Sequence, residues 1–322
     1  MIFGLAITGP TASGKTAISL RLAKRLSGEI ISADSMQIYK GMDIGTAKAT
    51  EEERAEIPHH LIDFLPPTES FSTELYRAAA LAAAKDITDR GRLPIFVGGT
   101  GLYIDTLMRA PMTEAPESSP EYRERLLASL GDGESTDRLW DRLYEVDPES
   151  AMAIHKNNVR RVIRALEIYD TAGIKKSELD KRSKEAPRDI SVGMITLDFH
   201  NRENLYRRID ARVDEMIRAG LVEEVSSLYA AGLLPDGSTA AQAIGYKEIV
   251  SYIKGNTTLD AARELIKLSS RRYAKRQLTW FRHNDGAFRL YLDSEDGKPY
   301  GTEHIITEAE IAAEKIMKDF GY

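Results

Sequence analysis

The sequence GPTASGKT spans residues 9–16 and directly follows the apolar run 2–7. It has the form G-x-x-x-x-G-K-[ST], and a helical pattern over Lys15–Leu26 begins near its end. A strand, such a loop and a helix in this order are the context in which the motif binds phosphate groups. Backbone N–H groups of the loop and of the helix N-terminus form a nest for anions. The stretch therefore predicts a P-loop that holds two or three phosphates.

The two side chains that end this motif have separate expected roles. Lys15 adds a positive charge to the bound phosphates, and the Thr16 hydroxyl is placed to reach a magnesium ion. A surface glycine turn is the alternative, but the periodicities on both sides favour the P-loop. The motif does not identify the ligand. The predicted diphosphate-binding residues are Gly9, Pro10, Thr11, Ala12, Ser13, Gly14, Lys15 and Thr16, with Thr16 also predicted to contact Mg²⁺.

Apolar segments alternate with helical patterns in the first third of the chain. Residues 2–8, 29–33 and 93–97 are short apolar runs bounded by turn residues, as expected of buried parallel strands. The patterns over residues 15–26 and 72–90 are helical. This alternation predicts an α/β fold with a P-loop NTPase-like core, in which helices flank a parallel sheet. Ligands bind at the carboxyl ends of the strands in such sheets.

The character of the sequence changes near residue 110. Residues 111–120 carry three prolines with several Ser, Thr and Glu residues, which indicates a linker. The pattern from 121 to about 184 is helical and highly charged, and strand character returns at 191–197. An all-helical insertion therefore interrupts the α/β core. The predicted parts are 1–112 for the first part of the core, 113–189 for the helical insertion domain, and 190–322 for the second part of the core.

The composition is that of a soluble globular protein. The 322 residues are 42% hydrophobic and 29% charged, with a net charge of −6, so any RNA site must be a local basic patch. The absence of cysteine excludes disulfides, thiolate metal sites and a cysteine nucleophile. No apolar run approaches the ~20 residues that span a bilayer. We expect a cytoplasmic protein with no membrane association.

A carboxylate follows the second predicted strand. Asp34 stands in ADSMQIY, residues 33–39, and is expected at the same edge of the sheet as the P-loop. There it would serve as a magnesium ligand or as a general base. The alternative is a residue that caps a turn or a helix. Ser35 and Gln37 are polar groups that could hydrogen-bond a base edge.

The third predicted strand ends in GGTG, residues 98–101. Three glycines around one hydroxyl allow a ligand to approach the backbone closely. An ordinary strand-to-helix turn explains the same residues equally well. Thr100 is accordingly either a helix N-cap or a hydrogen-bond donor in an active site.

An amphipathic helix is predicted over residues 203–219. Arg208 and Arg212 lie four residues apart beside its apolar stripe and could together clamp one diphosphate. From spacing alone, a solvated face on which these arginines pair with Asp210 and Asp214 is favoured. Further on, we expect a long helix that ends near residue 280 and a short strand over residues 288–292.

Two basic clusters could bind RNA. The first lies on one side of a helix in the insertion and contains Arg160, Arg161 and Arg164. The second mixes positive charge with aromatic rings and contains Arg271, Arg272, Tyr273, Lys275, Arg276, Trp280, Phe281 and Arg282. Basic side chains interleaved with rings suit single-stranded or loop RNA. Solvated helices with a few buried rings are the alternative.

Several long stretches, in this order, resemble the tRNA dimethylallyltransferase family nearly end to end. They are GPTASGKT at 9–16, ADSMQIYKGMDIGTAK at 33–48, PHHLID at 58–63, FVGGTGLYI at 96–104, QAIGYKE at 242–248 and KRQLTWFR at 275–282. The resemblance implies that the P-loop holds the diphosphate of dimethylallyl diphosphate, with Mg²⁺. It also implies transfer of the prenyl group to the exocyclic N6 of the adenosine next to the anticodon of tRNA.

The resemblance further implies roles for individual residues. Ser13, Lys15 and Thr16 would grip the diphosphate, with Arg208 and Arg212 as partners. Asp34 would receive the N6 proton, and Thr100 would hydrogen-bond near the reacting amine. The insertion would lie against the anticodon stem-loop, and the chain would act as a monomer. The implied tRNA-binding residues are Asp34, Ser35, Met36, Gln37, Thr100, Arg160, Arg161, Arg164, Gln242, Gly245, Tyr246, Lys247, Lys275, Arg276, Gln277, Trp280 and Arg282.

Other functions fit parts of the pattern. A P-loop small-molecule or nucleotide kinase would use Asp34 as the base for a hydroxyl acceptor. A non-catalytic RNA-binding protein would use the P-loop as a nucleotide switch. An isopentenyltransferase acting on free adenine nucleotides is a closer alternative. The basic aromatic helix and the insertion favour a macromolecular acceptor over these.

Overall fold

The computed structural model describes residues 2–110, 119–131, 135–284 and 286–322. The chain forms two compact units. Unit 1 consists of Met1–Met108 and Asp189–Tyr322, and unit 2 consists of Arg109–Arg188. Most of the predicted linker at 111–120 lies outside the described residues.

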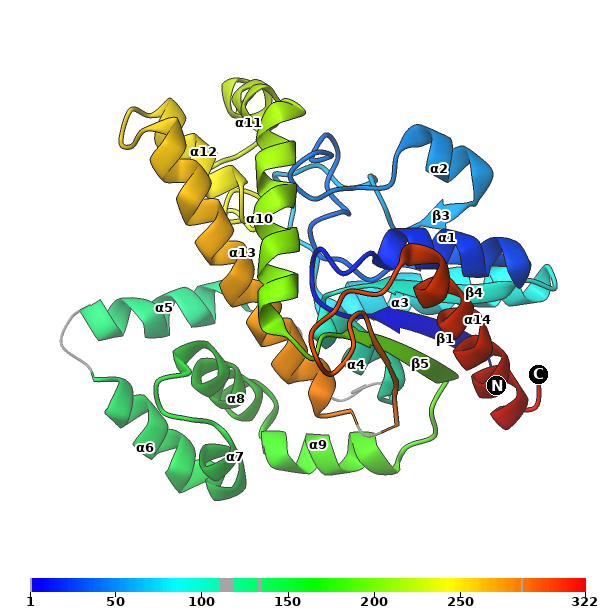
Figure 1. Cartoon of the computed structure of the whole chain (residues 1–322). Helices are drawn as coiled ribbons and strands as arrows, with labels where there is room; N and C mark the ends of the chain where they lie inside the picture. Colours follow the sequence, from blue (N-terminus) through cyan, green and yellow to red (C-terminus); the bar gives the residue numbers. More distant parts are fainter. Residues whose placement is uncertain (1, 111–118, 132–134, 285) are drawn as a thin grey trace. The chain divides into compact units, whose positions relative to one another are not determined.

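Unit 1 is built on one six-stranded sheet (Figure 1). Its strands are β1 (Ile2–Thr8), β2 (Gly28–Ser32), β3 (His59–His60), β4 (Leu93–Gly98), β5 (Ile190–Asp198) and β6 (Phe288–Tyr291). The strand order is β3-β2-β4-β1-β5-β6, and every pairing is parallel. All the strands therefore end at one edge, and the loop after β1 lies between those after β4 and β5.

Helices cover both faces of the sheet because successive side chains of a strand point to opposite faces. Leu5 and Ile7 of β1 pack in one cluster with α1 (Lys15–Arg25) and α14 (Thr302–Asp319). Ala6 packs in the other cluster with α3 (Thr73–Asp89) and α4 (Gly101–Met108). The predicted α/β fold, a parallel sheet flanked by helices, is confirmed.

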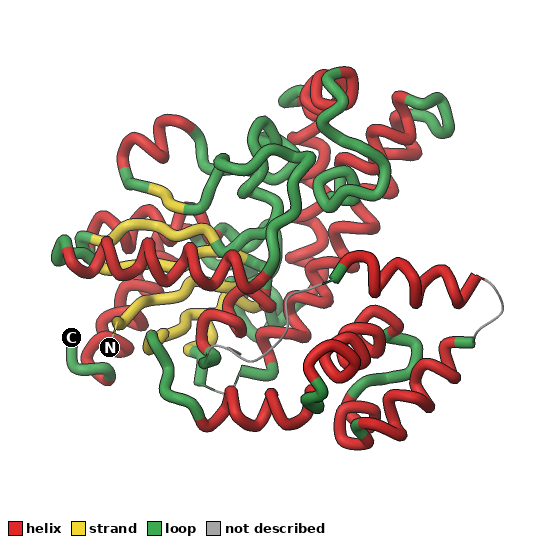
Figure 2. The backbone as a smooth tube through the Cα atoms, turned by 180° about the vertical axis from the view of Figure 1, so that it is seen from behind, coloured by secondary structure: helices red, strands yellow, loops and turns green. Residues whose placement is uncertain are grey.

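A group of helices packs beyond the carboxyl edge of the sheet. Its members are α10 (Arg202–Arg218), α11 (Leu221–Ala230), α12 (Tyr246–Ile253) and α13 (Leu259–Arg282). They share an apolar cluster with the loop that follows β2, through Ile38, Tyr39 and Met42. Helices α10 and α13 lie side by side, as both Figure 1 and Figure 2 show. A short helix, α2 (Glu51–Glu56), begins with a capping box at Thr50.

The described residues of unit 2 form helices joined by loops, with no strand. It contains α5 (Pro120–Gly131), α6 (Thr136–Val146), α7 (Pro148–Ala153), α8 (Val159–Ala172) and α9 (Lys176–Glu185). Leu139, Leu143 and Leu166 are central to its own apolar cluster. The buried Asp147 caps α7 at the Ser150 N–H (3.1 Å) and also accepts a hydrogen bond from the Ser177 N–H (3.0 Å), which ties α9 to α7.

Elements of unit 1 that were not predicted from the sequence include α2, β3 and α14. Strand β3 has two residues, too few for a period-two pattern. Helix α14 buries Ile305, Ile306, Ala309, Ala312 and Ala313, which recur at helical spacing, so the sequence carried a signal for this helix that was missed. Among the described helices, none is long and apolar enough to cross a membrane.

Candidate active site

The P-loop follows β1 and turns sharply against β5. Gly9 has φ of 140°, and a Cβ atom there would lie 2.8 Å from the Leu197 carbonyl oxygen. Gly14 has φ of 89° and caps the N-terminus of α1. Both positions therefore require glycine, one for space and conformation and the other for conformation. The first N–H groups of α1 face the loop without intrahelical acceptors, as at any helix start.

Two side chains of the P-loop fold back onto its own backbone. The Lys15 ammonium donates to the carbonyl oxygens of Gly9 (3.0 Å) and Pro10 (2.7 Å). The buried Ser13 hydroxyl donates to the same Pro10 oxygen (2.8 Å). Burial lowers the pKa of Lys15 to about 8, the charge of Asp34 opposes this shift, and the charge of Arg212 adds to it. Phosphate oxygens supply the negative charge that a partly desolvated ammonium group lacks.

The two arginines of α10 lie at the P-loop. Arg208 Nε donates to the Ala12 carbonyl oxygen (2.9 Å), and its NH2 atom lies 3.3 Å from where a Cβ atom of Gly14 would stand. Loss of solvent lowers the pKa of Arg208 and of Arg212, and the charge of Asp34 opposes the shift at Arg212. Cations from α1 and α10 thus gather beside one anion-binding loop.

The neighbouring aspartates of α10 have other partners. Asp210 pairs with Arg271 (2.6 Å) and Asp214 with Lys267 (2.8 Å), both on α13. The interpretation of Arg208 and Arg212 as a solvated face paired with these aspartates is therefore wrong. The reason is that one flank of α10 meets the P-loop and another flank meets α13.

Asp34 and Thr100 stand at the ends of β2 and β4, which are adjacent strands. Asp34 Oδ1 accepts a hydrogen bond from the Met36 N–H (2.9 Å), so the carboxylate also caps its own turn. Thr100 Oγ1 accepts from the Ser35 N–H (3.0 Å). The Thr100 N–H donates to the Ala33 carbonyl oxygen (3.2 Å). These hydrogen bonds join the loop after β2 to the loop after β4.

Glycine at position 98 makes this close approach possible. A Cβ atom there would lie 2.1 Å from the Ala33 carbonyl oxygen. The two tyrosines Tyr103 and Tyr273 also lie near Asp34: burial raises the pKa of each, and the charge of Asp34 adds to both shifts. These rings were not expected at the site from the sequence. The sequence features that could have indicated them are the GGTGLYI stretch, which contains Tyr103, and the basic aromatic cluster, which contains Tyr273.

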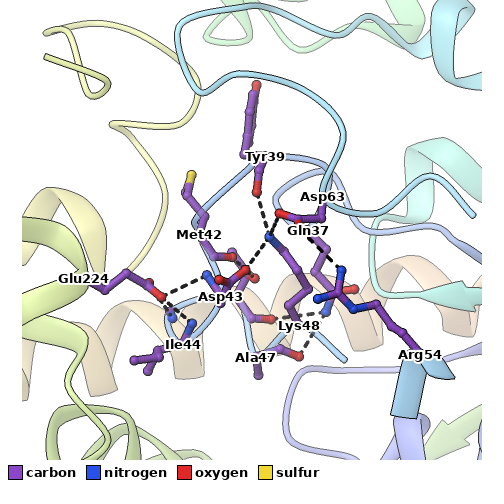
Figure 3. Close-up of polar contacts among 12 residues, drawn as sticks. Gln37, Tyr39, Met42, Asp43, Ile44, Ala47, Lys48, Arg54, Asp63 and Glu224 are labelled. Atoms are coloured by element: carbon purple, nitrogen blue, oxygen red, sulfur yellow. Dashed lines mark hydrogen bonds and ion pairs between the residues drawn. The ribbon is translucent and has the colours of Figure 1, made fainter. Parts of the chain in front are cut away.

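The loop that follows Asp34 is held from two sides (Figure 3). Glu224 of α11 accepts hydrogen bonds from the N–H groups of Asp43 (2.9 Å) and Ile44 (2.7 Å). The Gln37 amide donates to the carbonyl oxygens of Thr46 and Ala47, both at 3.2 Å. Gln37 is thus bonded within its own loop, where the sequence had suggested contact with a base edge.

Lys48 is the buried centre of this loop. Its side chain is 1% exposed, and its ammonium group donates to the Tyr39 carbonyl oxygen (2.8 Å) and contacts the carboxylates of Asp63 (2.7 Å) and Asp43 (2.6 Å). One buried cation therefore ties two points of its own loop to the segment around Asp63 (Figure 3).

Replacement of Lys48 by methionine is expected to lower the free energy of unfolding by about 3 kcal/mol, because a buried ion pair loses one partner. This loss is at the low end of the range for breaking a buried ion pair, because Asp43 and Asp63 keep contact with water. Chemical denaturation measures it. Lys24→Ala is the matched control, since the Lys24–Glu56 pair is 69% and 52% exposed and should contribute less than about 1 kcal/mol. Equal losses in the two variants would contradict this description of the loop.

The predicted tRNA-binding residues of α13 fall into two groups. Lys275 and Arg276 are exposed, as is Arg272 beside them. Gln277 and Arg282 point into the protein: Gln277 is buried, and Arg282 pairs with the buried Asp198 (2.8 Å). The Trp280 ring packs on the start of α4, where a Cβ atom of Gly101 would lie 2.4 Å from it.

Further predicted tRNA-binding residues lie on α12, just before it, and on α8. Gln242 and Lys247 are exposed, whereas Tyr246 is fully buried and donates to Glu224 Oε1 (2.6 Å). Gly245 is the N-cap of α12 with φ of 96°. In unit 2, Arg160 and Arg161 are exposed, while Arg164 pairs with the buried Glu167 (2.8 Å).

A magnesium ion would find few protein ligands here. No group of three or more His, Cys, Asp or Glu residues that could hold a metal occurs within the described part of the chain. Near the P-loop, the Thr16 hydroxyl and the Asp34 carboxylate are candidate oxygen donors. This small set fits Mg²⁺, which is bound by one or two protein groups together with phosphate oxygens and water.

Comparison with known proteins gives a consistent result. The IPP transferase family matches residues 37–284, and the isopentenyl transferase family matches residues 4–62. A tRNA dimethylallyltransferase of Caldanaerobacter subterraneus subsp. tengcongensis is 49% identical over 296 residues, which cover 91% of this chain and 92% of that protein.

Two solved structures are similar over most of the chain. The tRNA delta(2)-isopentenylpyrophosphate transferase of Staphylococcus epidermidis is 41% identical, with a TM-score of 0.69 over 98% of this chain and 99% of that one. A eukaryotic dimethylallyltransferase acting on tRNA is 30% identical, with a TM-score of 0.77 over 90% of this chain and 74% of that one. The P-loop, the two arginines and the carboxylate at one edge of the sheet are consistent with these matches. The matches show that the chain belongs to the tRNA dimethylallyltransferase family.

Proposed function

We propose that this protein transfers the dimethylallyl group from dimethylallyl diphosphate to the exocyclic N6 of the adenosine next to the anticodon of tRNA, and that it releases diphosphate. One observation carries the proposal. The P-loop with Lys15, the two arginines Arg208 and Arg212, and the carboxylate Asp34 lie at one edge of the sheet, close enough for their charges to act on one another.

The cations act on the leaving group. As N6 attacks C1 of the donor, the C1–O bond breaks and negative charge grows on the departing diphosphate. The P-loop N–H groups and Lys15 stabilise this charge, with Arg208 and Arg212 beside them. Mg²⁺, when bound, would neutralise part of the same charge, with the Thr16 hydroxyl as its protein ligand.

Asp34 acts on the acceptor. The alkylated nitrogen carries an extra proton, which passes to the Asp34 carboxylate as the new C–N bond forms. Thr100 lies beside it and offers a hydroxyl to the adenine amine. The target base must leave its stack to reach this edge, which costs a few kcal/mol, least where the RNA is a loop.

Exposed basic side chains form the protein surface that would bind tRNA. Arg272, Lys275 and Arg276 of α13 lie on the same unit as Gln242 and Lys247. Arg160 and Arg161 of unit 2 would contact the anticodon stem-loop. Phosphates of the RNA backbone are the expected partners of all these side chains.

The double variant Arg272→Ala/Arg276→Ala is expected to weaken tRNA binding and to flatten its salt dependence, because fewer counterions are released. The slope of log K against log salt should fall by roughly 1–2. A filter-binding titration at several salt concentrations measures it, with Lys85→Ala of α3 as the control. An unaltered slope would remove this face of α13 from the RNA interface.

A competition experiment tests the proposed donor. Calorimetry with Mg²⁺ should show binding of dimethylallyl diphosphate, and ATP should not displace it at equal concentration. Incubation with labelled donor and bulk tRNA should then label the RNA at adenosine. Micromolar ATP binding that dimethylallyl diphosphate does not compete with would instead favour a kinase.

A further inference from the structure

Gln277 joins the two loops that carry the proposed chemistry. It is 5% exposed on α13. Its Oε1 accepts a hydrogen bond from the Thr11 N–H (2.9 Å), and its Nε2 donates to the Gly99 carbonyl oxygen (2.9 Å). Thr11 belongs to the P-loop after β1, and Gly99 belongs to the loop after β4, the neighbouring strand. One side-chain amide therefore spans both loops.

On the donor side, the amide fixes one peptide unit. The Thr11 N–H and the Pro10 carbonyl belong to the same planar peptide. The Pro10 oxygen receives the hydrogen bonds of the Lys15 ammonium (2.7 Å) and the Ser13 hydroxyl (2.8 Å). Gln277 thus orients the Pro10 carbonyl group, which accepts a hydrogen bond from Lys15, the proposed phosphate-binding lysine.

On the acceptor side, the amide of Gln277 fixes a second peptide unit in the same way. The Gly99 carbonyl and the Thr100 N–H also belong to one peptide unit, and this N–H donates to the Ala33 carbonyl oxygen (3.2 Å) next to Asp34. A Cβ atom at position 99 would lie 2.1 Å from Gln277 Nε2, so glycine is needed for the amide to reach the backbone.

We propose that Gln277 is a positioning residue, which holds the diphosphate-binding loop and the Asp34–Thr100 loops at the separation that prenyl transfer requires. The proposal rests on the proposed function. It replaces the expected contact of Gln277 with tRNA, because both ends of its amide are already bonded inside the protein. Neither Lys275 nor Arg276, its exposed neighbours, shares these contacts.

The test compares Gln277→Met, which keeps the length but removes both hydrogen bonds, with the double variant Arg272→Ala/Arg276→Ala. Binding of inorganic pyrophosphate with Mg²⁺ and binding of tRNA are measured separately, together with kcat, KM and the melting temperature. In Gln277→Met, pyrophosphate affinity and kcat should each fall about tenfold or more, because a buried amide N–H and a carbonyl lose their partner. The tRNA affinity should change less than about twofold. The double variant should lose tRNA affinity and keep its pyrophosphate affinity.

Gln277→Glu provides a second readout that does not depend on the fold of Gln277→Met. A protonated carboxylic acid has an acceptor and a donor as the amide has, whereas a carboxylate has no donor for Gly99. The ratio of variant to wild-type kcat should therefore rise as pH falls. Tyr273 hydrogen-bonds the amide and lies near the charges of Asp34 and Arg276. These groups are the same in both enzymes, so the ratio reports on position 277.

Three results would overturn the proposal. The first is a loss of tRNA affinity with unchanged pyrophosphate affinity, which would make Gln277 an RNA contact. The second is a lower melting temperature with normal kcat per folded molecule, which would make its role structural alone. The third is a pH-independent ratio for Gln277→Glu. Failure of the wild-type enzyme to prenylate tRNA would refute the proposed function instead, and the pyrophosphate comparison would still be measurable.

Discussion

Asp34→Asn is expected to lower kcat by roughly 10²–10⁴, the usual contribution of a general base. Asparagine keeps the shape of the side chain and an acceptor for the Met36 N–H, so the turn after β2 should persist. It has no basic oxygen to receive the N6 proton. Donor and tRNA affinities should change little, so kcat and kcat/KM should fall by a similar factor, the mark of an interaction made mainly in the transition state. Single-turnover kinetics with saturating donor measure the effect.

The other roles of Asp34 predict different results. If Asp34 only caps its turn, the variant should be less stable while the folded fraction turns over normally. If it binds the metal, higher magnesium should restore part of the rate. Asp43→Asn is the matched control, because this carboxylate lies in the same loop, is 57% exposed and contacts Lys48. Near-normal kcat in well-folded Asp34→Asn enzyme would refute the mechanism.

Lys15→Ala is expected to impair diphosphate binding and turnover together, because in the proposed mechanism the ammonium group contacts the leaving group before and during its departure. Loss of one preorganised donor at a developing charge costs roughly 10²–10³ in rate. Steady-state kinetics with varied donor, together with pyrophosphate titration, measure both effects. Lys24→Ala at the far end of α1 is the control. An unchanged KM for the donor would show that Lys15 has another role.

The pKa of Lys15 gives this prediction a second test. In the free protein the pKa is lowered to about 8, and a bound diphosphate raises it because the added negative charge favours the ammonium form. Near pH 8.5, donor binding should therefore take up protons, and affinity should decrease as pH rises through about 8. The ligand phosphates, with pKa near ~6, are already ionised there. Calorimetry in two buffers of different ionisation enthalpy measures the uptake, which Lys15→Ala should abolish.

Local sequence determined the core of the fold. The apolar runs that became β1, β2 and β4 are continuous because a central parallel strand is buried on both faces, and each lies within two residues of its predicted bounds. The P-loop motif could also be predicted, since Gly9 and Gly14 both adopt a positive φ at fixed positions along the chain, although the close approach of Gly9 to Leu197 depends on the tertiary fold. The carboxyl ends of parallel strands meet at one edge, so Asp34 and Thr100 could be placed near the loop without a structure.

Only the tertiary structure decided which faces of the helices serve the site. Spacing on α10 is the same for Arg208 and Arg212 as for Asp210 and Asp214. The two pairs have different partners because one flank of α10 packs against the P-loop and another against α13. Gln277 stands 266 residues from Thr11, and its sequence neighbours are exposed cations. Such pairings depend on which elements lie side by side, whereas periodicity and motifs report only the next few residues along the chain.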